Sequence, residues 1–534
     1  MPAKAFGLSA AGVLAALAGF AWLAADHDTP SLSQPKLGED ADAAMRGAAV
    51  FAGGAFGGIS LTALETNAVP FKLVAAALVL EEQARDPATP ADLATLRRVM
   101  QRFGFLYPIE VDGLPDGVRL TLAEKPLGMT HGMIAPIGGA QVEIANLGCA
   151  ACHGGVAYAS DGTPEPQRAV LGMPNTSLDL ESYTQAVFVA LRRHADSPAL
   201  LEMAERLFPE MGWRERVSLR WIVLPLARDR LDRLAGKDRA LPFPNGLPGA
   251  TNGVAALKLQ SGTPFLGGGM EDRGFVSIPD LALRHRRSRL LADGAYATPS
   301  GTANLRELAA ITSFFTVPSM GVKPEEARRH IPDAEAIFAW LADYRPQAFP
   351  GPVDLGDAER GAAIYAAGCA ACHGRVDWNG GAPRLLSYPD WIGDVGTDPL
   401  RAAAIDEPLA AAIRGSAYGK AIIVRPGDGY AAPPLAGVWS SAPYLHNGSV
   451  PSLAALLDPR LRPARFMVGG HALDWESMGL LLTPEGTYPE GYLPFAMPQW
   501  VDTSQPGLSN SGHRYGSELT LQERRALIEF LKLL

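Results

Sequence analysis

The chain opens with an apolar run from Ala5 to Ala25, preceded by Lys4. The run is long enough for a membrane-spanning helix, which needs about 20 residues, whereas the apolar core of a secretory signal is usually shorter. Residues 1–25 are therefore predicted to be either a membrane anchor or a cleaved signal sequence. Both alternatives export the rest of the chain and predict a periplasmic protein. The polar, proline-containing residues 26–40 then form a tether.

Two later segments have the residue pattern of helices. One begins at Ile331-Pro332-Asp333 and continues to Tyr344. The other lies at the C-terminus, where Thr520 and Glu523 fit a capping box. Its apolar residues recur at helical spacing, at Leu527, Ile528, Phe530, Leu531 and Leu534. We expect each helix to close one structural unit.

A proline-rich stretch, residues 345–352, separates these two units. Pro346, Pro350 and Pro352 cannot continue a helix, so we place a domain boundary here. The first predicted domain covers residues 41–345 and the second covers residues 353–534. The first domain is larger because of an insertion at about residues 165–310, which includes a predicted helix over 180–194.

A short alanine-rich pattern occurs twice along the chain. Residues 44–51 read A-M-R-G-A-A-V-F, in a helix predicted to begin near Asp42, and residues 359–368 read E-R-G-A-A-I-Y-A-A-G. The second copy leads directly into a cysteine motif, whereas the first does not. Two explanations stay open: the first copy is a degenerate version of the second helix, or two alanine-rich helices are similar by chance.

The composition predicts many loops and argues against nucleic acid as a partner. The 57 glycines and 44 prolines predict much irregular chain, and few strands are evident, so the expected fold class is mainly α. The net charge of −9 lacks the basic footprint of a nucleic-acid-binding protein. It mildly favours a basic or neutral protein partner.

The four cysteines carry the chemistry. They form two copies of one motif, Cys149-Ala-Ala-Cys152-His153 and Cys369-Ala-Ala-Cys372-His373. Two thiols on one turn can reach the two vinyl groups of a haem, and the next histidine can reach the iron, so C-x-x-C-H is typical of c-type haem attachment. Zinc sites or redox dithiols are the alternatives, but no further cysteine ligands exist and a dithiol needs no following histidine. We therefore predict two covalently bound haem c groups (iron), with His153 and His373 as iron ligands.

The residue on the opposite side of each iron decides the chemistry. Methionine there raises the reduction potential, and an open position permits dioxygen or peroxide chemistry. Both predicted domains offer several candidates for this position. In the second domain they are His446, His471, His513, Met467, Met478 and Met497. In the first they include His131, His194, His285, Met129, Met133 and Met173.

The C-terminal region resembles a known superfamily. Residues 442–453 read A-P-Y-L-H-N-G-S-V-P-S-L, which is similar to a segment of the di-haem cytochrome c peroxidase superfamily, closest to the rubber-oxygenase-like branch. Residues 509–516 read S-N-S-G-H-R-Y-G and match a second segment of that branch. The resemblance implies that His513 is the distal ligand of the second haem. It also implies two cytochrome c-like domains with long loops. His446, in the first segment, is expected to support the pocket and not to bind iron.

The first domain departs from the superfamily pattern. Peroxidases of the superfamily carry F-W-D-G after the first haem motif, whereas the nearest match here is Leu291-Ala-Asp-Gly294, which lacks the tryptophan and lies far beyond His153. For this reason no catalytic residue is carried over, and whether the chain is an enzyme stays undecided.

Three functions remain open for an exported di-haem oxidoreductase. The first is a peroxidase that receives electrons from a small redox protein through the C-terminal haem and reduces peroxide at the N-terminal haem. The second is an oxygenase that uses dioxygen on a hydrocarbon. The third is an electron-transfer cytochrome without a substrate, in which both irons have two axial ligands.

Overall fold

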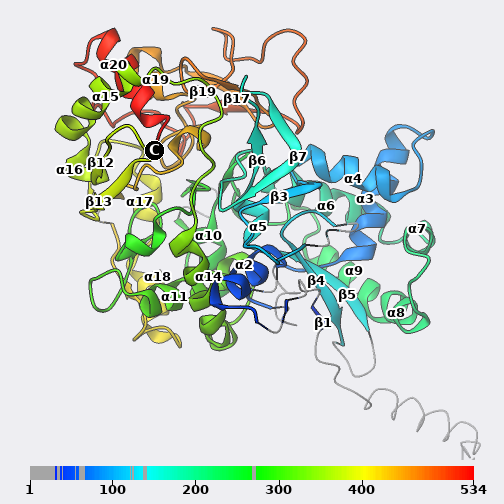
Figure 1. Cartoon of the computed structure of the whole chain (residues 1–534). Coiled ribbons are helices and arrows are strands. Elements are labelled where there is room, and N and C mark those ends of the chain that lie inside the picture. Colours follow the sequence, from blue (N-terminus) through cyan, green and yellow to red (C-terminus); the bar gives the residue numbers. More distant parts are fainter. Residues whose placement is uncertain are drawn as a thin grey trace, which may run out of the picture.

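The computed structural model of the chain describes residues 31–32, 37–38, 40–54, 56–58, 67–120, 122, 125–135, 141–266, 272–427 and 429–534. The apolar run Ala5–Ala25 and most of the tether lie outside these residues. Within the described part, no helix combines the length and the apolar character that crossing a membrane requires. Figure 1 shows the arrangement of the described elements.

Two helix pairs frame the molecule. Helix α2 (Ala43–Ala52) packs against α14 (Ile331–Asp343), and α15 (Leu355–Gly368) packs against α20 (Leu521–Leu531). The predicted C-terminal capping box is confirmed, with Thr520 as the cap and Glu523 as its partner. Asp42 caps α2 by accepting a hydrogen bond from the backbone of Met45, which confirms the predicted start of this helix.

Each of the two helix pairs has a close backbone contact at a glycine. A methyl group added at Gly47 would collide with the backbone carbonyl of Ala336, and one added at Gly361 would collide with that of Ala526. Gly47 and Gly361 occupy the same position in the repeated alanine-rich pattern. The correspondence in space therefore favours related helices over chance similarity.

Further helices complete the helical part of the fold. The helix predicted over 180–194 is present as α6 (Leu180–His194). The other helices of at least five residues are α3 (Phe71–Arg85), α4 (Leu93–Arg102), α7 (Ala199–Leu207), α8 (Trp213–Ser218), α9 (Leu224–Arg233), α10 (Gly253–Ser261), α11 (Leu305–Phe314), α12 (Thr316–Met320), α17 (Leu400–Ala404), α18 (Glu407–Gly415) and α19 (Leu453–Leu457). A π-helical turn, η2 (Leu219–Val223), joins α8 to α9.

The sequence predicted a mainly α fold, but the structure contains more strand than that prediction implies. One antiparallel sheet has the order β1 (Ser31–Leu32), β4 (Met129–Ile134), β5 (Val142–Leu147), β2 (Val69–Pro70). A second has the order β3 (Glu110–Asp112), β7 (Pro164–Leu171), β6 (Gly154–Tyr158), with β3 and β7 parallel. The protein is 39% helical and 14% strand, so helix predominates but the fold is not purely α.

Smaller strand pairs complete the fold. They include β10 (Arg289–Leu290) with β11 (Tyr296–Ala297) and β15 (Ile423–Val424), β12 (Arg375–Asp377) with β13 (Arg384–Ser387), β14 (Ile392–Gly393) with β16 (Tyr430–Ala431), β17 (Arg465–Val468) with β20 (Gln499–Asp502), and β18 (Leu473–Asp474) with β19 (Gly479–Leu480). A pair in the first half joins β8 (Ala250–Thr251) to β9 (Val276–Ser277).

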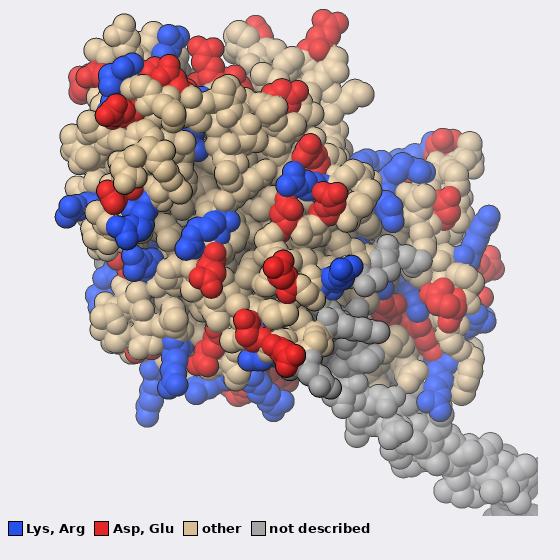
Figure 2. Space-filling view, viewed as in Figure 1, with Lys and Arg blue, Asp and Glu red and all other residues tan. Residues whose placement is uncertain are grey.

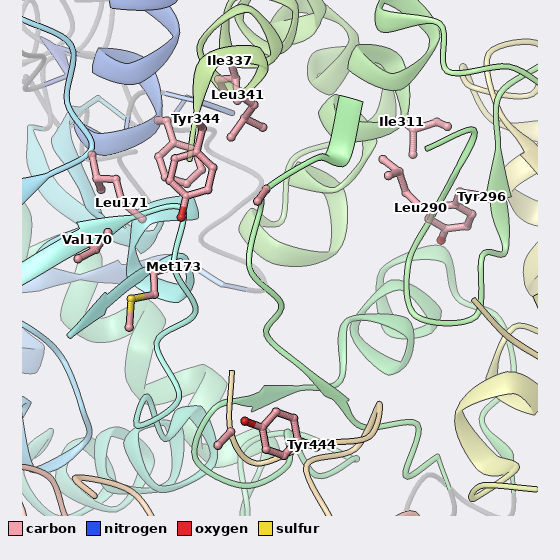
Figure 3. Packing of buried hydrophobic residues seen from close by; sticks show 14 of the residues in the cluster. Val170, Leu171, Met173, Leu290, Tyr296, Ile311, Ile337, Leu341, Tyr344 and Tyr444 are labelled. Atoms are coloured by element: carbon pink, nitrogen blue, oxygen red, sulfur yellow. The ribbon is translucent and has the colours of Figure 1, made fainter. Parts of the chain in front are cut away.

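Two hydrophobic clusters form the core. The larger cluster takes residues from both ends of the chain, from Ala48 to Leu531, and the smaller one lies within residues 68–224. Figure 3 shows part of the larger cluster, where Tyr344 lies near Leu171. Because this cluster draws on both sides of residues 345–352, the two halves share buried surface. The predicted domain boundary stays a prediction.

The surface seen in Figure 2 carries acidic and basic side chains interspersed with neutral ones. No single sign of charge dominates this face. The view therefore agrees with a modest net charge of −9 and gives no sign of the broad basic surface on which nucleic acid binds.

Candidate haem sites

The first cysteine motif lies on one helical turn, α5 (Cys149–Cys152), directly after strand β5. Strand β6 begins at Gly154, so His153 stands between the turn and a buried strand. Its Nδ1 lies 3.0 Å from the carbonyl oxygen of Pro279. A hydrogen bond from Nδ1 leaves Nε2 available for a metal, which is the usual arrangement of a ligating histidine.

The second motif repeats this arrangement. Helix α15 ends at Gly368, Cys369 follows, and α16 (Ala370–His373) ends in the histidine. The Nδ1 of His373 lies 2.7 Å from the carbonyl oxygen of Pro433. Each motif histidine is thus oriented by the carbonyl of a proline from a distant segment. Burial lowers the pKa of both histidines, that of His153 to about 4, which favours the neutral ring that binds metals.

The four cysteines are free of disulfides. Burial raises the pKa of Cys149 and Cys152 to about 12 and that of Cys369 to about 11. Among the described residues, no group of three or more His, Cys, Asp or Glu side chains could hold a metal ion. This finding counts against zinc at either motif. It leaves the thiols available for haem attachment.

His513 lies opposite His373. The two ring centres are 6.3 Å apart. A histidine nitrogen lies about 2.0 to 2.1 Å from a bound metal such as zinc, and the ring centre lies about 1.1 Å behind that nitrogen, so two imidazoles across one ion have centres about 6.3 Å apart. The spacing therefore fits one metal ion between the rings. Burial, with a contribution from His373, lowers the pKa of His513 to about 4.

The loop that carries His513 is held by its backbone. The backbone N–H of His513 donates to the carbonyl of Val395 at 2.7 Å. The guanidinium of Arg462 donates to the carbonyls of Asn510, Gly512 and His513. His513 itself has a left-handed backbone, with φ of 44°. These contacts fix the position of the ring without using its own nitrogens, and Nδ1 is a buried atom without a hydrogen-bond partner.

Both motifs open into one cavity of about 2650 Å³. Its lining includes all four cysteines, the two motif histidines, His446 and His513. A typical pocket for one small molecule has about 300–1,000 Å³, so this cavity can hold more than one large group. The residues present therefore fit a haem at each motif.

Only some of the other candidate iron ligands line the cavity. His446 lines the cavity, and its ring stacks on Tyr430 with centres 4.0 Å apart. Its backbone carbonyl accepts a hydrogen bond from Ser277. Burial, together with Arg401, lowers the pKa of His446 to about 3. This packing agrees with the expected supporting role.

Most of the remaining candidates do not line the cavity. His471 is buried beside Thr176, and His131 and His194 lie within 3.3 and 2.9 Å of Glu143 and Glu81. Met129, in β4, does line the cavity. The candidates outside the lining are His131, His194, His285, His471, Met133, Met173, Met467, Met478 and Met497. Among the described residues, no histidine other than His153 is therefore identified as an iron ligand at the first motif. Of the described methionines, only Met129 lines the cavity.

The sequence analysis missed three arginines of the cavity wall. Arg284, Arg287 and Arg401 line the cavity, and the last two are each 2% exposed. Nε of Arg287 and both Nε and Nη1 of Arg401 have no hydrogen-bond partner, although Arg401 pairs with Asp293 at 3.3 Å. Unpartnered buried donors call for an acceptor, and haem carries two propionate carboxylates. These arginines would hold such carboxylates, which supports the fit.

One of these arginines acts on the first motif. Arg284 donates to the backbone carbonyl of Asp280 and contributes to the low pKa of His153. Burial raises the pKa of Asp280 to about 7 and lowers that of Arg284 to about 9. Sequence patterns gave no signal for this cluster, because its members are joined only by the fold. Asp293 belongs to the Leu291–Gly294 segment that departs from the superfamily pattern.

The cavity continues into an apolar chamber beside the first motif. Side chains from α6, η2, α9 and α10 form its walls. They include Tyr183, Val187, Phe188, Leu191, Val223, Leu226, Leu231, Leu234 and Leu259. The carboxylates that line the whole cavity are Asp238, Asp280, Glu518 and Glu523. Of these, Asp280 follows the Pro279 that orients His153, and its carboxylate accepts a hydrogen bond from Tyr344. The rest of the surface beside the first motif is largely apolar.

Comparison with known proteins places the C-terminal half. A family model described as RoxA-like, cytochrome c-like matches residues 429–467, and one described as cytochrome C oxidase, cbb3-type, subunit III matches residues 356–420. These matches imply a cytochrome c domain with covalently bound haem c in this half.

Two proteins of Sinorhizobium fredii are similar over part of the chain. One, the uncharacterized protein y4iM, is 32% identical over 182 residues, which are 28% of this chain and 39% of y4iM. The other, the uncharacterized protein y4iJ, is 30% identical over 269 residues, which are 38% of this chain and 43% of y4iJ. The chain thus spans less than half the length of either relative. Over residues 356–420 and 429–467 the chain is thus similar to c-type cytochrome families.

Proposed function

We propose that this protein is an exported di-haem c-type oxidoreductase with a reactive N-terminal haem and an electron-relaying C-terminal haem. The observation that carries the proposal is the difference between the two motifs. His373 faces His513 at a spacing that fits one iron, whereas no second histidine is assigned to His153 within the described residues. A haem with an open axial position supplies dioxygen or peroxide chemistry when bound.

The chain's own residues prepare the first site for such chemistry. Pro279 orients His153 through its carbonyl oxygen. The apolar walls of the chamber exclude water and favour an apolar substrate. The buried arginines neutralise carboxylates that would otherwise lie unpaired in the cavity. Met129 is the described side chain that could reach the open position, because it alone of the candidate methionines lines the cavity.

Oxygenation of a hydrocarbon is the reaction that the chamber supports best. Its apolar lining suits a hydrocarbon, and the match to the RoxA-like model lies in the same chain. In such a reaction both oxygen atoms of dioxygen enter the product, so the reaction needs no net supply of electrons. His373 and His513 would hold the second haem, which would supply electron transfer when bound.

Peroxide reduction is the second candidate function, and the paired histidines favour it. A six-coordinate haem suits electron transfer, and peroxide reduction needs two electrons from a donor such as a small redox protein. Peroxide cleavage uses general acid–base catalysis. The carboxylate that follows Pro279, that of Asp280, already accepts a hydrogen bond from Tyr344, which weakens the case for peroxide reduction.

A carbon monoxide titration tests the proposal. The reduced protein should bind carbon monoxide at one of its two haems, with the His373 haem unchanged. Absence of binding at both haems would overturn the proposal in favour of an electron carrier. Oxygen uptake with a hydrocarbon and no donor then separates oxygenation from donor-dependent peroxide turnover. Isotopic ¹⁸O₂ should label the oxygenated product at both new oxygen atoms.

Export is part of the same proposal. Haem attachment to C-x-x-C-H motifs and the apolar N-terminal run both fit a periplasmic protein, either anchored in the inner membrane or released after cleavage. Alkaline phosphatase fused after the tether should be active in cells, since that reporter folds only outside the cytoplasm. An active cytoplasmic reporter at the same position would contradict export.

A further inference from the structure

One helical segment presents apolar side chains to solvent. Helix α8, the turn η2 and helix α9 run without a break from Trp213 to Arg233. Trp213 is 63% exposed, Val217 39%, Trp221 70% and Leu226 61%. The first three lie four residues apart and so share one helix face. We call these four side chains the docking face.

The opposite side of the segment is firmly attached. The carboxylate of Glu215 is buried, lies 2.5 Å from Nζ of Lys72 and accepts a hydrogen bond from the backbone of Glu143. Ser218 and Leu219 are buried as well. The docking face is therefore exposed on a fixed helix and does not result from a loose end.

The π-helical turn follows from a proline in the sequence. Pro225 lies in the first turn of α9 and has no N–H, so the carbonyl of Trp221 cannot receive the regular helical hydrogen bond from this residue. A π-helical turn at Leu219–Val223 accommodates the break, and such turns are frequent at functional sites. Here Trp221 is exposed while the next residues, Ile222 and Val223, line the cavity.

Basic side chains surround the docking face. Arg214 lies over the ring of Trp213 at 5.7 Å, and Arg220 lies over that of Trp221 at 5.6 Å. Residues 213–237 contain seven Lys or Arg and three Asp or Glu, in a chain whose net charge is −9. Within the segment Glu215 pairs with Lys72, whereas Arg228 and Arg233 pair with Asp196 and Asp229. The segment is thus locally basic within an acidic protein.

We propose that the docking face binds the surface of an anionic lipid bilayer. A helix lies in a membrane interface when one face carries tryptophan and leucine and its borders carry arginine. Tryptophan favours the headgroup level, and each arginine near an anionic surface adds attraction. The alternation of exposed tryptophan with arginine along residues 213–221 supplies both terms, which is why a lipid surface is favoured over a protein partner.

The docking face also marks the mouth of the apolar chamber. Leu226 belongs to the docking face and lines the cavity, and Arg230 and Leu234 continue the lining one and two turns later. A bilayer bound here would lie against the chamber's opening. An apolar molecule dissolved in lipid could then enter without crossing water. This last step rests on the proposed oxygenation of a hydrocarbon, whereas lipid binding does not.

A spin label at Val217 tests the inference directly. In the haem-loaded full chain the native cysteines are bound to haem, so the Val217→Cys variant offers one reactive thiol, and the unsubstituted protein should take up no label. With vesicles of phosphatidylglycerol and phosphatidylcholine, the nitroxide should become more accessible to oxygen and less accessible to a water-soluble nickel complex. A label in the Leu493→Cys variant, at a site 88% exposed, is the matched control and should stay in water. Because the measurement is local, an N-terminal anchor does not affect it.

Two further measurements test whether insertion depends on the arginines and on anionic lipid. Arg214→Gln with Arg220→Gln should shift the Val217 label back towards water, and vesicles of phosphatidylcholine alone should do the same. A Val217 label that behaves like the Leu493 label would overturn the inference. Insertion that is equally deep in neutral vesicles would overturn the anionic preference. Lipid insertion without oxygen uptake would refute the proposed function and leave the docking face standing.

Discussion

Single side chains set the difference between the two haem sites. His373 and His513 face each other, whereas His153 has a fixed orientation and no described histidine partner. The position of His513 depends on backbone contacts from Val395 and Arg462, so replacing its ring should leave the loop in place. A mutation at this residue therefore reports on the iron and not on the fold.

Replacing His513 by alanine should change one haem only. Loss of the imidazole should convert the His373 haem from low spin to high spin, or recruit a substitute ligand. The His153 haem should keep its spectrum. Optical and electron paramagnetic resonance spectra of the oxidised protein measure both. His446→Phe, which preserves stacking on Tyr430, is the control and should alter neither haem. If His513→Ala leaves both spectra unchanged, the ligand assignment is wrong.

Replacing Arg401 by glutamine should lower a haem reduction potential. A buried cation favours the reduced iron, which carries one positive charge fewer, and about 1 kcal/mol of interaction corresponds to about 43 mV for one electron. We therefore expect a decrease of tens of millivolts in a spectroelectrochemical titration. Arg286→Gln, at an exposed neighbour of the cluster, should leave the potentials unchanged. Equal potentials in wild type and Arg401→Gln would show that Arg401 does not face a haem carboxylate.

At the scale of elements, two helix pairs repeat one packing solution. In each pair a glycine lets a helix approach a backbone carbonyl of its partner, at Gly47 beside Ala336 and at Gly361 beside Ala526. The sequence indicated the similarity of the first helices and a closing helix for each unit, but not that each closing helix packs against an alanine-rich helix. Partner choice depends on long-range packing, which a local pattern does not encode.

Adding a methyl group at Gly361 should destabilise the second pair. The new group would meet the carbonyl of Ala526, and overpacking of this kind typically costs about 1–3 kcal/mol. Gly361→Ala should lower the free energy of unfolding by that amount in a denaturant titration. Gly415→Ala, in α18 where no atom lies within 4 Å of the added group, should be neutral or slightly stabilising. Similar values for the two variants would refute the role of the close contact.

Local signals in the sequence predicted some features of the protein and missed others. Caps and periodicity gave the helix starts at Asp42 and Thr520, since these depend on neighbouring residues. The sheet of β4 and β5 was missed because its strands lie in the segment between the first alanine-rich helix and the first cysteine motif, where no alternation was recognised. The arginine cluster was missed because a cluster assembled from residues 284–401 has no sequence spacing.

At the scale of the molecule, the loop around Gly470–Leu473 is one of the regions through which the C-terminal half contacts the first half. The backbone of Gly470 donates to Ser177, and that of Leu473 donates to Gly162. Within this region His471 is fully buried and lies 3.4 Å from Thr176. A titratable ring thus lies in the contact between the halves, away from the cavity.

Acid should weaken this contact through His471. Burial lowers its pKa from 6.5 to about 4, so the unfolded state binds a proton first as the pH falls below 6.5. The stability is fully present above pH 6.5 and is lost progressively as the pH decreases to about 4. A shift of this size corresponds to as much as about 3 kcal/mol. The free energy of unfolding, measured from pH 7.5 to 4, should therefore decrease less steeply in His471→Asn, which keeps a polar side chain but cannot titrate. Carboxylates titrate equally in both proteins, so the difference between the two curves isolates one proton. Parallel curves would exclude His471 as a source of acid sensitivity and would move the search to carboxyl groups in the same contact.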